Sequence, residues 1–319
     1  MEILIDNRKG EVFDIPVKSF EWKTERIGKA SSFEADMYND KPLEFPVEGG
    51  AIIRATEGNN KIFYGFAFED GIKKSGDMSI KAYDQLRYLK NQDTYVMPSS
   101  TATTAIKRIA GMLNLSTGIL EDTKFVVPGI VEDEKEAFDV VAKFLDSTLI
   151  ATNRNFILFD NFGKLDLRSI ENLVIPADDF YIGDDSLLYD YEYSKSIDKE
   201  TYNKIKFVRD NKKKAKRETF IAQDSANIKK WGLLQQFRKV DENMTDAQIK
   251  ELVERSIKAY NKETKTLELS CLGNWKVRAG RMLYLYIAKL GIKDYVMIDE
   301  CTHKWQEGVH TMDLKVKVV

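Results

Sequence analysis

Residues 46–56 read Pro-Val-Glu-Gly-Gly-Ala-Ile-Ile-Arg-Ala-Thr, and residues 276–288 read Lys-Val-Arg-Ala-Gly-Arg-Met-Leu-Tyr-Leu-Tyr-Ile-Ala. In each stretch a short connection ends in glycine, and a mainly apolar run follows it. Runs of this kind, bounded by glycine and proline, are typical of β-strands. Both stretches also lie at the same point of a longer series of predicted β elements, and this likeness decides the architecture that we expect.

The longer series has five segments in the same order near both ends of the chain. Near the N-terminus the segments are 33–37, 46–50, 51–56, 63–69 and 78–82. Near the C-terminus they are 267–271, 276–280, 281–288, 295–303 and 312–318. Short β-meanders resemble one another in any case, so a chance likeness is the alternative explanation. A true repeat predicts two similar β domains, which can take equivalent places in a closed ring of subunits.

The composition limits the class of protein. The 319 residues include 49 Lys and Arg against 51 Asp and Glu, so the formal net charge is -2, and 43% of the residues are hydrophobic. Such a chain can bury large cores, but it lacks the basic excess that a dedicated nucleic-acid binder needs. We therefore expect a globular protein with no specific nucleic-acid binding and no cofactor.

The cysteines and the N-terminus indicate the compartment. Cys271 and Cys301 are too few for a disulfide framework and, with only two histidines in the chain, for a structural zinc site. This usage is typical of a reducing compartment. The N-terminal residues lack the basic patch and apolar run of a signal peptide, and no stretch reaches the roughly 18 apolar residues of a membrane span. We expect a soluble protein that carries no signal peptide and no membrane span.

The pattern of elements divides the chain into three predicted domains. Residues 1–95 carry alternating β signals and predict a small β-barrel or sandwich. Residues 96–175 predict an α+β middle domain, and residues 176–319 predict a second β domain with an inserted helix at 245–262. The expected fold class is therefore α+β, with two β-barrel domains flanking a smaller middle domain.

Start signals place the helices. The run 99–101 offers capping oxygens to a helix whose apolar stripe lies within 106–113. A second stripe lies within 137–145, and we expect the acidic run 132–134 at the positive N-terminal pole of that helix. Thr245-Asp246-Ala247-Gln248 matches a capping box at the start of the third helix.

The two histidines, His303 and His310, form the first candidate site. A tight turn at 307–308 would place Trp305 opposite His310 and both imidazoles on one face of a hairpin. Asp299 would then oppose an apolar strand, so we expect a bulge near it. We interpret His303, Trp305 and His310 as structural or interface residues, with metal ligation as the minor alternative.

The strongest local charge asymmetry is a basic hairpin with a predicted turn at Asp210-Asn211. Its basic residues are Lys204, Lys206, Arg209, Lys212, Lys213, Lys214, Lys216 and Arg217. The simpler interpretation is a solvated tip whose lysines keep a sheet edge from pairing. The alternative is a docking arm for an acidic partner or for DNA, and the candidate docking residues are then Lys212, Lys213, Lys214, Lys216 and Arg217.

Enzyme signatures are absent from the sequence. It contains no nucleophile elbow, phosphate-binding loop, zinc-protease motif or dinucleotide fingerprint. The acidic pairs Asp178-Asp179 and Asp184-Asp185 lie in segments typical of turns, although two carboxylates suffice for a glycosidase. We predict no catalytic residue, no metal site and no enzymatic activity.

Several motifs occur in order along the chain: Tyr83-Asp84-Gln85-Leu86, the segment 224–235, the helix opened by Thr245, the element 272–280 and the ending 310–314. Together they resemble one known family, the XkdQ/YqbQ-like baseplate hub proteins of PBSX-type prophages, and the resemblance covers essentially the whole chain. Each motif is weak by itself, and their order along the chain makes the set specific.

The resemblance implies a structural role in contractile tails. Family hubs are homotrimers, in which two tube-type barrel domains per subunit form a pseudo-hexameric ring between the hexameric tail tube and the trimeric spike. The expected partners are therefore further copies of the chain, the tail tube protein, the central spike protein, and other baseplate and tape-measure components.

The resemblance thus predicts a symmetry adaptor in the baseplate of a phage tail, a phage-tail-like bacteriocin (tailocin) or another contractile injection system. The protein would be made in the bacterial cytoplasm and assembled into the virion or tail-like particle. The alternatives are a tail-associated cell-wall hydrolase and a surface-binding module.

Overall fold

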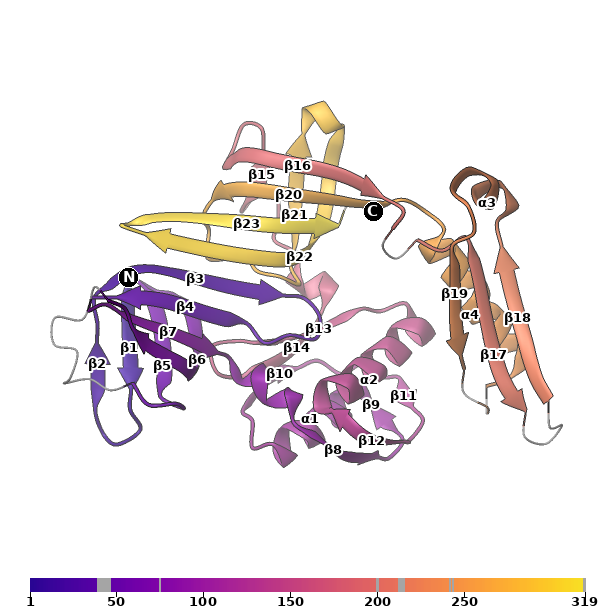
Figure 1. The fold of residues 1–319 in the computed structure, drawn as a ribbon, viewed down its shortest axis with the longest axis horizontal. Coiled ribbons are helices and arrows are strands. Elements are labelled where there is room, and N and C mark those ends of the chain that lie inside the picture. Colours follow the sequence, from indigo (N-terminus) through magenta and orange to yellow (C-terminus); the bar gives the residue numbers. More distant parts are fainter. Residues whose placement is uncertain are drawn as a thin grey trace. The chain divides into compact units, whose positions relative to one another are not determined.

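The structure, a computed structural model, describes residues 1–38, 47–74, 76–198, 201–211, 216–240, 242 and 244–317. The fold is mostly β with several helices (Figure 1). The first β region contains β1 (Glu2–Asp6), β2 (Val12–Asp14), β3 (Val17–Glu25), β4 (Ser32–Met37), β5 (Ile52–Glu57), β6 (Asn60–Ile72) and β7 (Met78–Tyr83).

The first β region encloses a core. In Figure 1, β1, β2 and β5 run steeply across the direction of β3, β4 and β7. Alternate residues of these strands point inward, among them the fully buried Phe33, Met37 and Ile53. Because burial of each such side chain contributes roughly 1.5–3 kcal/mol, the period-two pattern fixes which face of each strand lies inside.

The middle region follows a short 3₁₀ helix, η1 (Gln85–Lys90). Its other elements are β8 (Gln92–Met97), β9 (Ser100–Thr101), α1 (Ala102–Met112), β10 (Thr117–Leu120), β11 (Val126–Val127), β12 (Ile130–Glu136), α2 (Ala137–Thr152), β13 (Phe156–Asp160), β14 (Leu165–Ser169) and η2 (Ile170–Leu173). Thr101 caps α1 by accepting a hydrogen bond from the Thr104 amide, as predicted. The predicted hairpin of 156–167 is also confirmed, as β13 and β14.

The acidic run at 132–134 is not at a helix pole, so that prediction is wrong. These residues lie in β12, which pairs antiparallel with β8. Glu132 lies opposite Tyr95, the register shifts at the next two residues, and Asp133 accepts a hydrogen bond from the Thr94 hydroxyl of β8. Helix α2 begins only at Ala137.

The rest of the chain contains β15 (Tyr181–Gly183), β16 (Leu188–Ser196), β17 (Lys204–Asn211), β18 (Lys216–Gln223), α3 (Ser225–Trp231), β19 (Gln235–Lys239), α4 (Asp246–Tyr260), β20 (Thr264–Leu272), β21 (Met282–Ile287), η4 (Ala288–Leu290), β22 (Ile292–Gln306) and β23 (Val309–Lys317). Contacts divide the chain into two compact units, residues 1–192 with 268–318 and residues 193–267. The predicted boundaries near 95 and 175 stay predictions.

The smaller unit has a core of its own. Its three-stranded sheet has the order β18-β17-β19. Ile205 and Phe207 of β17 pack with Ile249 and Val253 of α4, and all four are buried. The predicted capping box of α4 is confirmed, because Thr245 and Gln248 bond each other's backbone amides.

The predicted repeat is present in the strand topology. The first region has the order β4-β7-β6-β5, and the last has the order β20-β23-β22-β21, built from segments in the same sequence order. A strand flanks the first member of each set, β3 beside β4 and β16 beside β20. We call each set with its flanking strand a module.

The two modules also have equivalent hydrogen bonds at the glycine connections. Gly50 donates to Ala67 at 2.8 Å, and Gly280 donates to Ile298 at 2.9 Å. Ala67 and Ile298 in turn donate to the carbonyls of the residues that follow these glycines. Both glycines have positive φ, +88° and +86°, a region that favours glycine. The two stretches that open the sequence analysis are thus structural equivalents.

The strands of both modules belong to one sheet. Its main path runs β16-β20-β23-β22-β3-β4-β7-β6-β5-β1-β2. Among the described residues no pairing joins the two ends of this path. The closed barrels that the sequence indicates therefore stay a prediction.

The repeat generates a test with a built-in control. We expect Gly280→Ala to lower the free energy of unfolding by about 2–4 kcal/mol, because an added Cβ would lie 2.7 Å from the Ile157 side chain besides straining the backbone. Gly50→Ala meets no atom of the described residues within 4 Å, so we expect it to bear only the backbone strain, about 1–2 kcal/mol. Denaturant unfolding followed by tryptophan fluorescence measures both, and equal losses would contradict this account.

Candidate assembly interface

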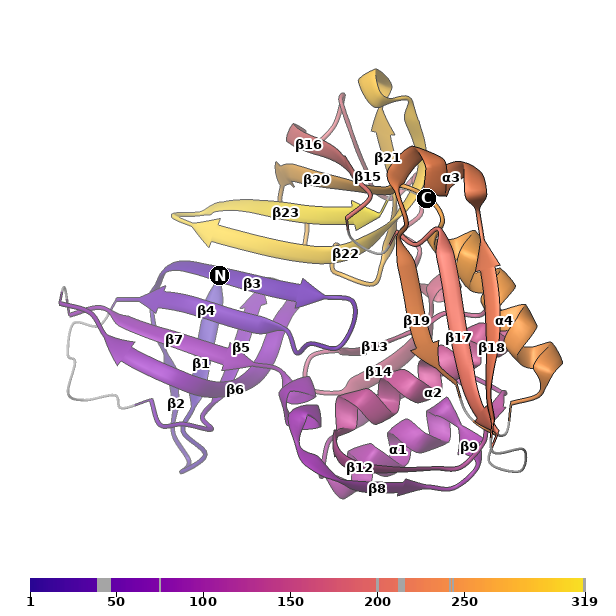
Figure 2. The same cartoon turned by 45° about the vertical axis from the view of Figure 1, so that its right-hand side comes forward.

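The two modules are joined edge to edge by β3 and β22. These strands pair antiparallel over seven residue pairs, from Glu25 opposite Glu300 to Ser19 opposite Gln306. Figure 2 shows the two strands side by side, β3 at the edge of the first module and β22 in the second. We call this pairing the module joint.

Aromatic side chains pack under the module joint. Trp22 stacks on His303 with ring centroids 5.1 Å apart, and Phe20 stacks on Trp305 at 5.9 Å. Trp275 stacks on His310 at 3.5 Å and donates from its indole Nε1 to Glu57 at 2.7 Å. The cluster therefore ties strands from both modules into one core.

The predicted geometry of the histidine hairpin is confirmed. His303 pairs with Met312 and Trp305 pairs with His310. The register shifts between Ile298 and Glu300, which places the expected bulge at Asp299. The bulge keeps Asp299 out of the ladder. Its carboxylate instead accepts a hydrogen bond from the Arg26 side chain at 2.6 Å.

The two imidazoles bond each other. His303 Nε2 lies 2.9 Å from the Val277 carbonyl, which can only accept, so this nitrogen carries the proton. His303 Nδ1 therefore accepts from His310 Nε2 at 2.9 Å. With both of its nitrogens engaged, His303 has no lone pair left for a metal ion. Among the described residues no three His, Cys, Asp or Glu side chains are grouped to hold one.

Burial keeps both histidines neutral. It lowers the pKa of His303 to about 3, with further lowering from the nearby His310 and Arg278. It also lowers the pKa of His310 to about 4, against a smaller opposing effect of Glu57. Burial raises the pKa of both cysteine thiols, that of Cys271 to about 12, so neither is a reactive thiolate near neutral pH.

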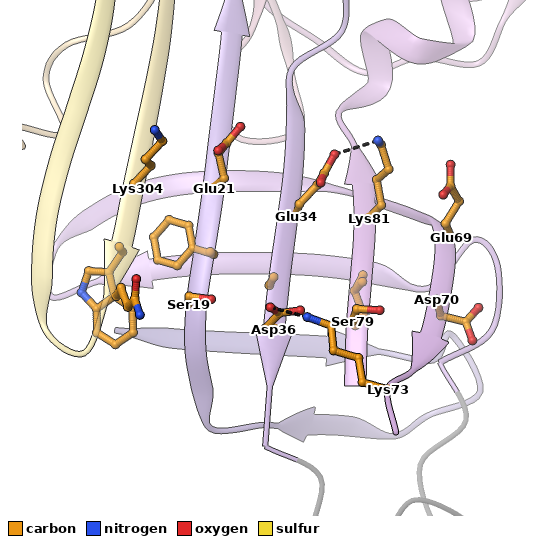
Figure 3. Close-up of a pocket in the computed structure, with 15 residues that line it drawn as sticks. Ser19, Glu21, Glu34, Asp36, Glu69, Asp70, Lys73, Ser79, Lys81 and Lys304 are labelled. Carbon is orange, nitrogen blue, oxygen red and sulfur yellow. Dashed lines mark hydrogen bonds and ion pairs between the residues drawn. The ribbon is translucent and has the colours of Figure 1, made fainter. Parts of the chain in front are cut away.

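The outer face of the sheet is polar across the module joint. Lys304 of β22, Glu21 of β3, Glu34 of β4, Lys81 of β7 and Glu69 of β6 are successive cross-strand neighbours. Figure 3 shows these five side chains in one row. Lys81 bonds Glu34 at 2.7 Å, and the residues next to these two along β4 and β7, Phe33, Ala35, Ile80 and Ala82, are buried in the core. We call this series the charged row.

A shallow groove lies along this face in each module. The first groove is lined by Ser19, Phe20 and Glu21 of β3 and Glu34, Ala35 and Asp36 of β4, with residues of β6, β7 and β22. The second is lined by Asp190, Tyr191 and Glu192 of β16 and Glu268, Leu269 and Ser270 of β20, with residues of β22 and β23. The two grooves occupy equivalent places in the repeat.

A buried polar cluster lies where the 276–280 connection meets the middle region. Asp84 accepts from the amide and the hydroxyl of Ser31 and caps η1. Arg278 donates to the Asp160 backbone carbonyl at 2.9 Å. Burial raises the pKa of the Asp84 and Asp160 carboxyls, and for Asp160 repulsion by Asp84 adds to it. Spacing in the sequence did not indicate this cluster, because its members come from three distant segments.

The basic hairpin is β17 paired with β18. Asp210 and Asn211 pair with Arg217 and Lys216, so they belong to the ladder, and the prediction of a turn there is wrong. Lys212, Lys213 and Lys214 lie outside the described residues.

Two arginines of this hairpin, Arg209 and Arg217, are paired with acidic side chains. Arg217 and Lys239 each bond Asp210 at 2.7 Å, and these bonds lower the pKa of that carboxyl. Arg209 bonds Glu218 and Asp246. Internal pairing thus offsets part of the positive charge, and the docking role of Lys216 and Arg217 stays a prediction.

Burial of His303 makes its own contribution to stability sensitive to acid. The unfolded chain takes up a proton at His303 below pH 6.5, whereas the folded chain does so only near pH 3, so stability is lost as the pH falls between these values. The loss reaches about 1.4 kcal/mol per pH unit for this group.

Replacing His303 should reduce this dependence on pH, while the lowered pKa of His310 keeps part of it. We expect the stability of His303→Gln to decline less steeply than that of the natural chain between pH 6.5 and 4, whatever its stability at neutral pH. Urea unfolding at a series of pH values measures both slopes. Parallel curves would show that His303 does not carry the effect.

Comparison with known proteins identifies relatives of this chain. The YqbQ protein of Bacillus subtilis (strain 168) is 30% identical over 274 residues, which cover 84% of this chain and 81% of YqbQ. The PBSX phage-like element protein XkdQ of the same organism is 26% identical over 319 residues, 94% of this chain and 95% of XkdQ.

A solved structure shares the fold. The 43 kDa tail protein of prophage MuSo2 from Shewanella oneidensis is 12% identical, with a TM-score of 0.74 over 99% of this chain and 98% of that one. A model of the YQBQ-like family matches residues 20–317. The chain therefore belongs to the YQBQ-like family, as its motifs predicted.

Proposed function

We propose that the protein is the baseplate hub of a contractile tail or tail-like particle. In this role it is a structural protein, a homotrimer whose paired modules form a pseudo-hexameric ring between the hexameric tail tube and the trimeric spike. Its partners are the tube protein, the spike protein and other baseplate and tape-measure components, and its place is in the assembled particle.

The module joint is the observation that carries this proposal. It unites two modules of equal strand order side by side, through different edges of each. A contact between unlike edges can be repeated from copy to copy, and it forms a closed ring when the rotation allows. With two modules per chain, a homotrimer presents six similar units. Its six units match a sixfold tube above, and its three chains match a threefold spike below.

The relatives support the same role. XkdQ belongs to a phage-like element, and the structure that shares the fold is a prophage tail protein. None of the described helices is long and apolar enough to cross a membrane. The two relatives fit a tail component better than a cell-wall hydrolase or a surface-binding module.

The outer face of the sheet is the surface that we assign to the channel. Its two grooves make it concave, and its charged row carries three Glu against two Lys. A polar, slightly acidic lining repels polyanions and has few sites where a passing chain could adhere. Barrel closure belongs to the same proposal, since sheets of neighbouring subunits would complete it.

The assembled particle provides the test. We expect electron microscopy of tail particles to place this chain as a trimer between the tube and the spike, and quantitative mass spectrometry to find half as many copies as in one tube ring. A particle without the chain, or a hexameric ring of it, would overturn the proposal. A cell-wall turbidity assay on the purified chain separates the hub from a hydrolase, and we expect no clearing.

A further inference from the structure

We propose that β16 of one copy pairs with the outer half of β6 of the next copy, antiparallel and in the register of the module joint. This inference rests on the proposed function, because it supplies the contact that closes the ring. The partner is therefore a second copy of this chain, and the contact is the same contact that β3 and β22 make within one chain.

The first partner edge is the end of β6. Residues 60–66 of this strand pair with β5 on one side, and residues 66–72 pair with β7 on the other. Beyond Phe66 the β5 side of the strand has no partner strand in the described part of the chain. Ile72 lies on this edge with 61% of its surface exposed.

The end of β6 is equivalent to the part of β22 that forms the module joint. Ala67 and Ile298 make the same two hydrogen bonds to the glycine connections. A register shift follows each of them, before Glu69 in one module and before Glu300 in the other. A shift of 231 positions therefore converts β6 into β22.

The second partner edge is β16, which is one end of the sheet path. Its equivalent is β3. The Leu272 amide donates to the Leu187 carbonyl at 3.0 Å, as the Tyr38 amide donates to the Pro16 carbonyl at 2.9 Å. The linings of the two grooves then correspond along these strands, with Asp190-Tyr191-Glu192 in the place of Ser19-Phe20-Glu21. A shift of 171 positions converts β3 into β16.

These equivalences fix which residues would meet. The pair Lys304 and Glu21 of the module joint corresponds to Lys73 of one copy opposite Glu192 of the next copy. His303 opposite Trp22 becomes Ile72 opposite Tyr193, and Cys301 opposite Thr24 becomes Asp70 opposite Lys195. Two pairs of opposite charge and one apolar-aromatic pair thus face each other, combinations that stabilise antiparallel strands.

The charged row repeats in full only if this contact forms. Within one chain the row reads Lys304, Glu21, Glu34, Lys81, Glu69. The equivalent residues read Lys73, Glu192, Glu268, Lys315, Glu300, which are the same residue types in the same order. Four of them lie in the second module. The leading lysine is Lys73, which directly follows β6 and is ion-paired with Asp36 of its own chain at 2.6 Å, so the contact between copies would add Glu192 as a second acidic neighbour.

The second module alone has no lysine at the position equivalent to Lys304, and this affects the charge around Glu192. Glu21 and Glu34 are direct cross-strand neighbours, an unfavourable pair that Lys304 and Lys81 flank. In the second module Lys315 lies 3.7 Å from Glu268 on one side. Lys73 of a neighbouring copy would complete the flanking of Glu192 on the other side.

Engineered cysteines test the register. Lys73 and Glu192 are exposed, so cysteine at both positions should not disturb folding, and the natural Cys271 and Cys301 are fully buried. Facing strand residues have Cα atoms about 4.5–5.5 Å apart, within disulfide range. We expect mild oxidation of particles carrying Lys73→Cys with Glu192→Cys to convert most of the chain into covalent trimers on a non-reducing gel.

Two matched variants serve as controls. Glu21→Cys with Lys304→Cys is the equivalent pair of the module joint and should close within each chain, without a larger species. Lys73→Cys with Asp190→Cys is displaced by two residues along the same face, and it should cross-link at least tenfold more slowly.

Each outcome decides a separate point. Trimers from the first pair alone support the inference. If the module-joint pair closes in particles while the first pair stays monomeric, the edge contact is overturned and the hub proposal stands. If the chain is absent from particles, or imaging finds no trimer of it, the hub proposal fails and the inference fails with it.

Discussion

The architecture depends on the pairing of β3 with β22. These strands come from opposite ends of the chain, and Thr24 and Cys301, which bond across them, are 277 positions apart. Closing so long a loop costs conformational entropy, although the cost grows only slowly with loop length. The ladder, with the stacked Trp22-His303 and Phe20-Trp305 pairs beneath it, offsets that cost and makes one sheet of two modules. The aromatic core and the charged row both require this contact.

The repeat turns this contact into a rule for assembly. A sheet edge is a hazard in a soluble protein, because its unpaired amides and carbonyls can bind any other strand. The chain has one such edge at β16 and another at the end of β6, and these are the equivalents of the two edges that meet inside the chain. Pairing them between copies would satisfy both edges with a geometry that the chain already contains. The same logic explains why the charged residues of the outer face recur in order.

Sequence patterns predicted the local features well. Thr101 and Thr245 cap their helices, and Trp305 faces His310 across a hairpin whose bulge falls at Asp299. Each of these features depends on residues close in the chain. One failure came where a more distant partner decides. The run 132–134 is acidic enough for a helix pole, yet it lies in a strand paired with β8. The other failure is local, because the ladder of the β17–β18 hairpin extends through Asp210 and Asn211, where a turn was expected.

The sequence by itself determined the repeated modules, the inward face of each strand and the family, because these follow from residue order and the period of apolar side chains. Only the tertiary structure decided that the modules share one sheet and that His303 bonds His310. It alone gathered Asp84, Asp160 and Arg278 into a buried cluster. These features join side chains that are remote in the chain or whose bonding depends on rotamer and tautomer. Such choices are made by packing and desolvation, which no pattern of neighbouring residues records.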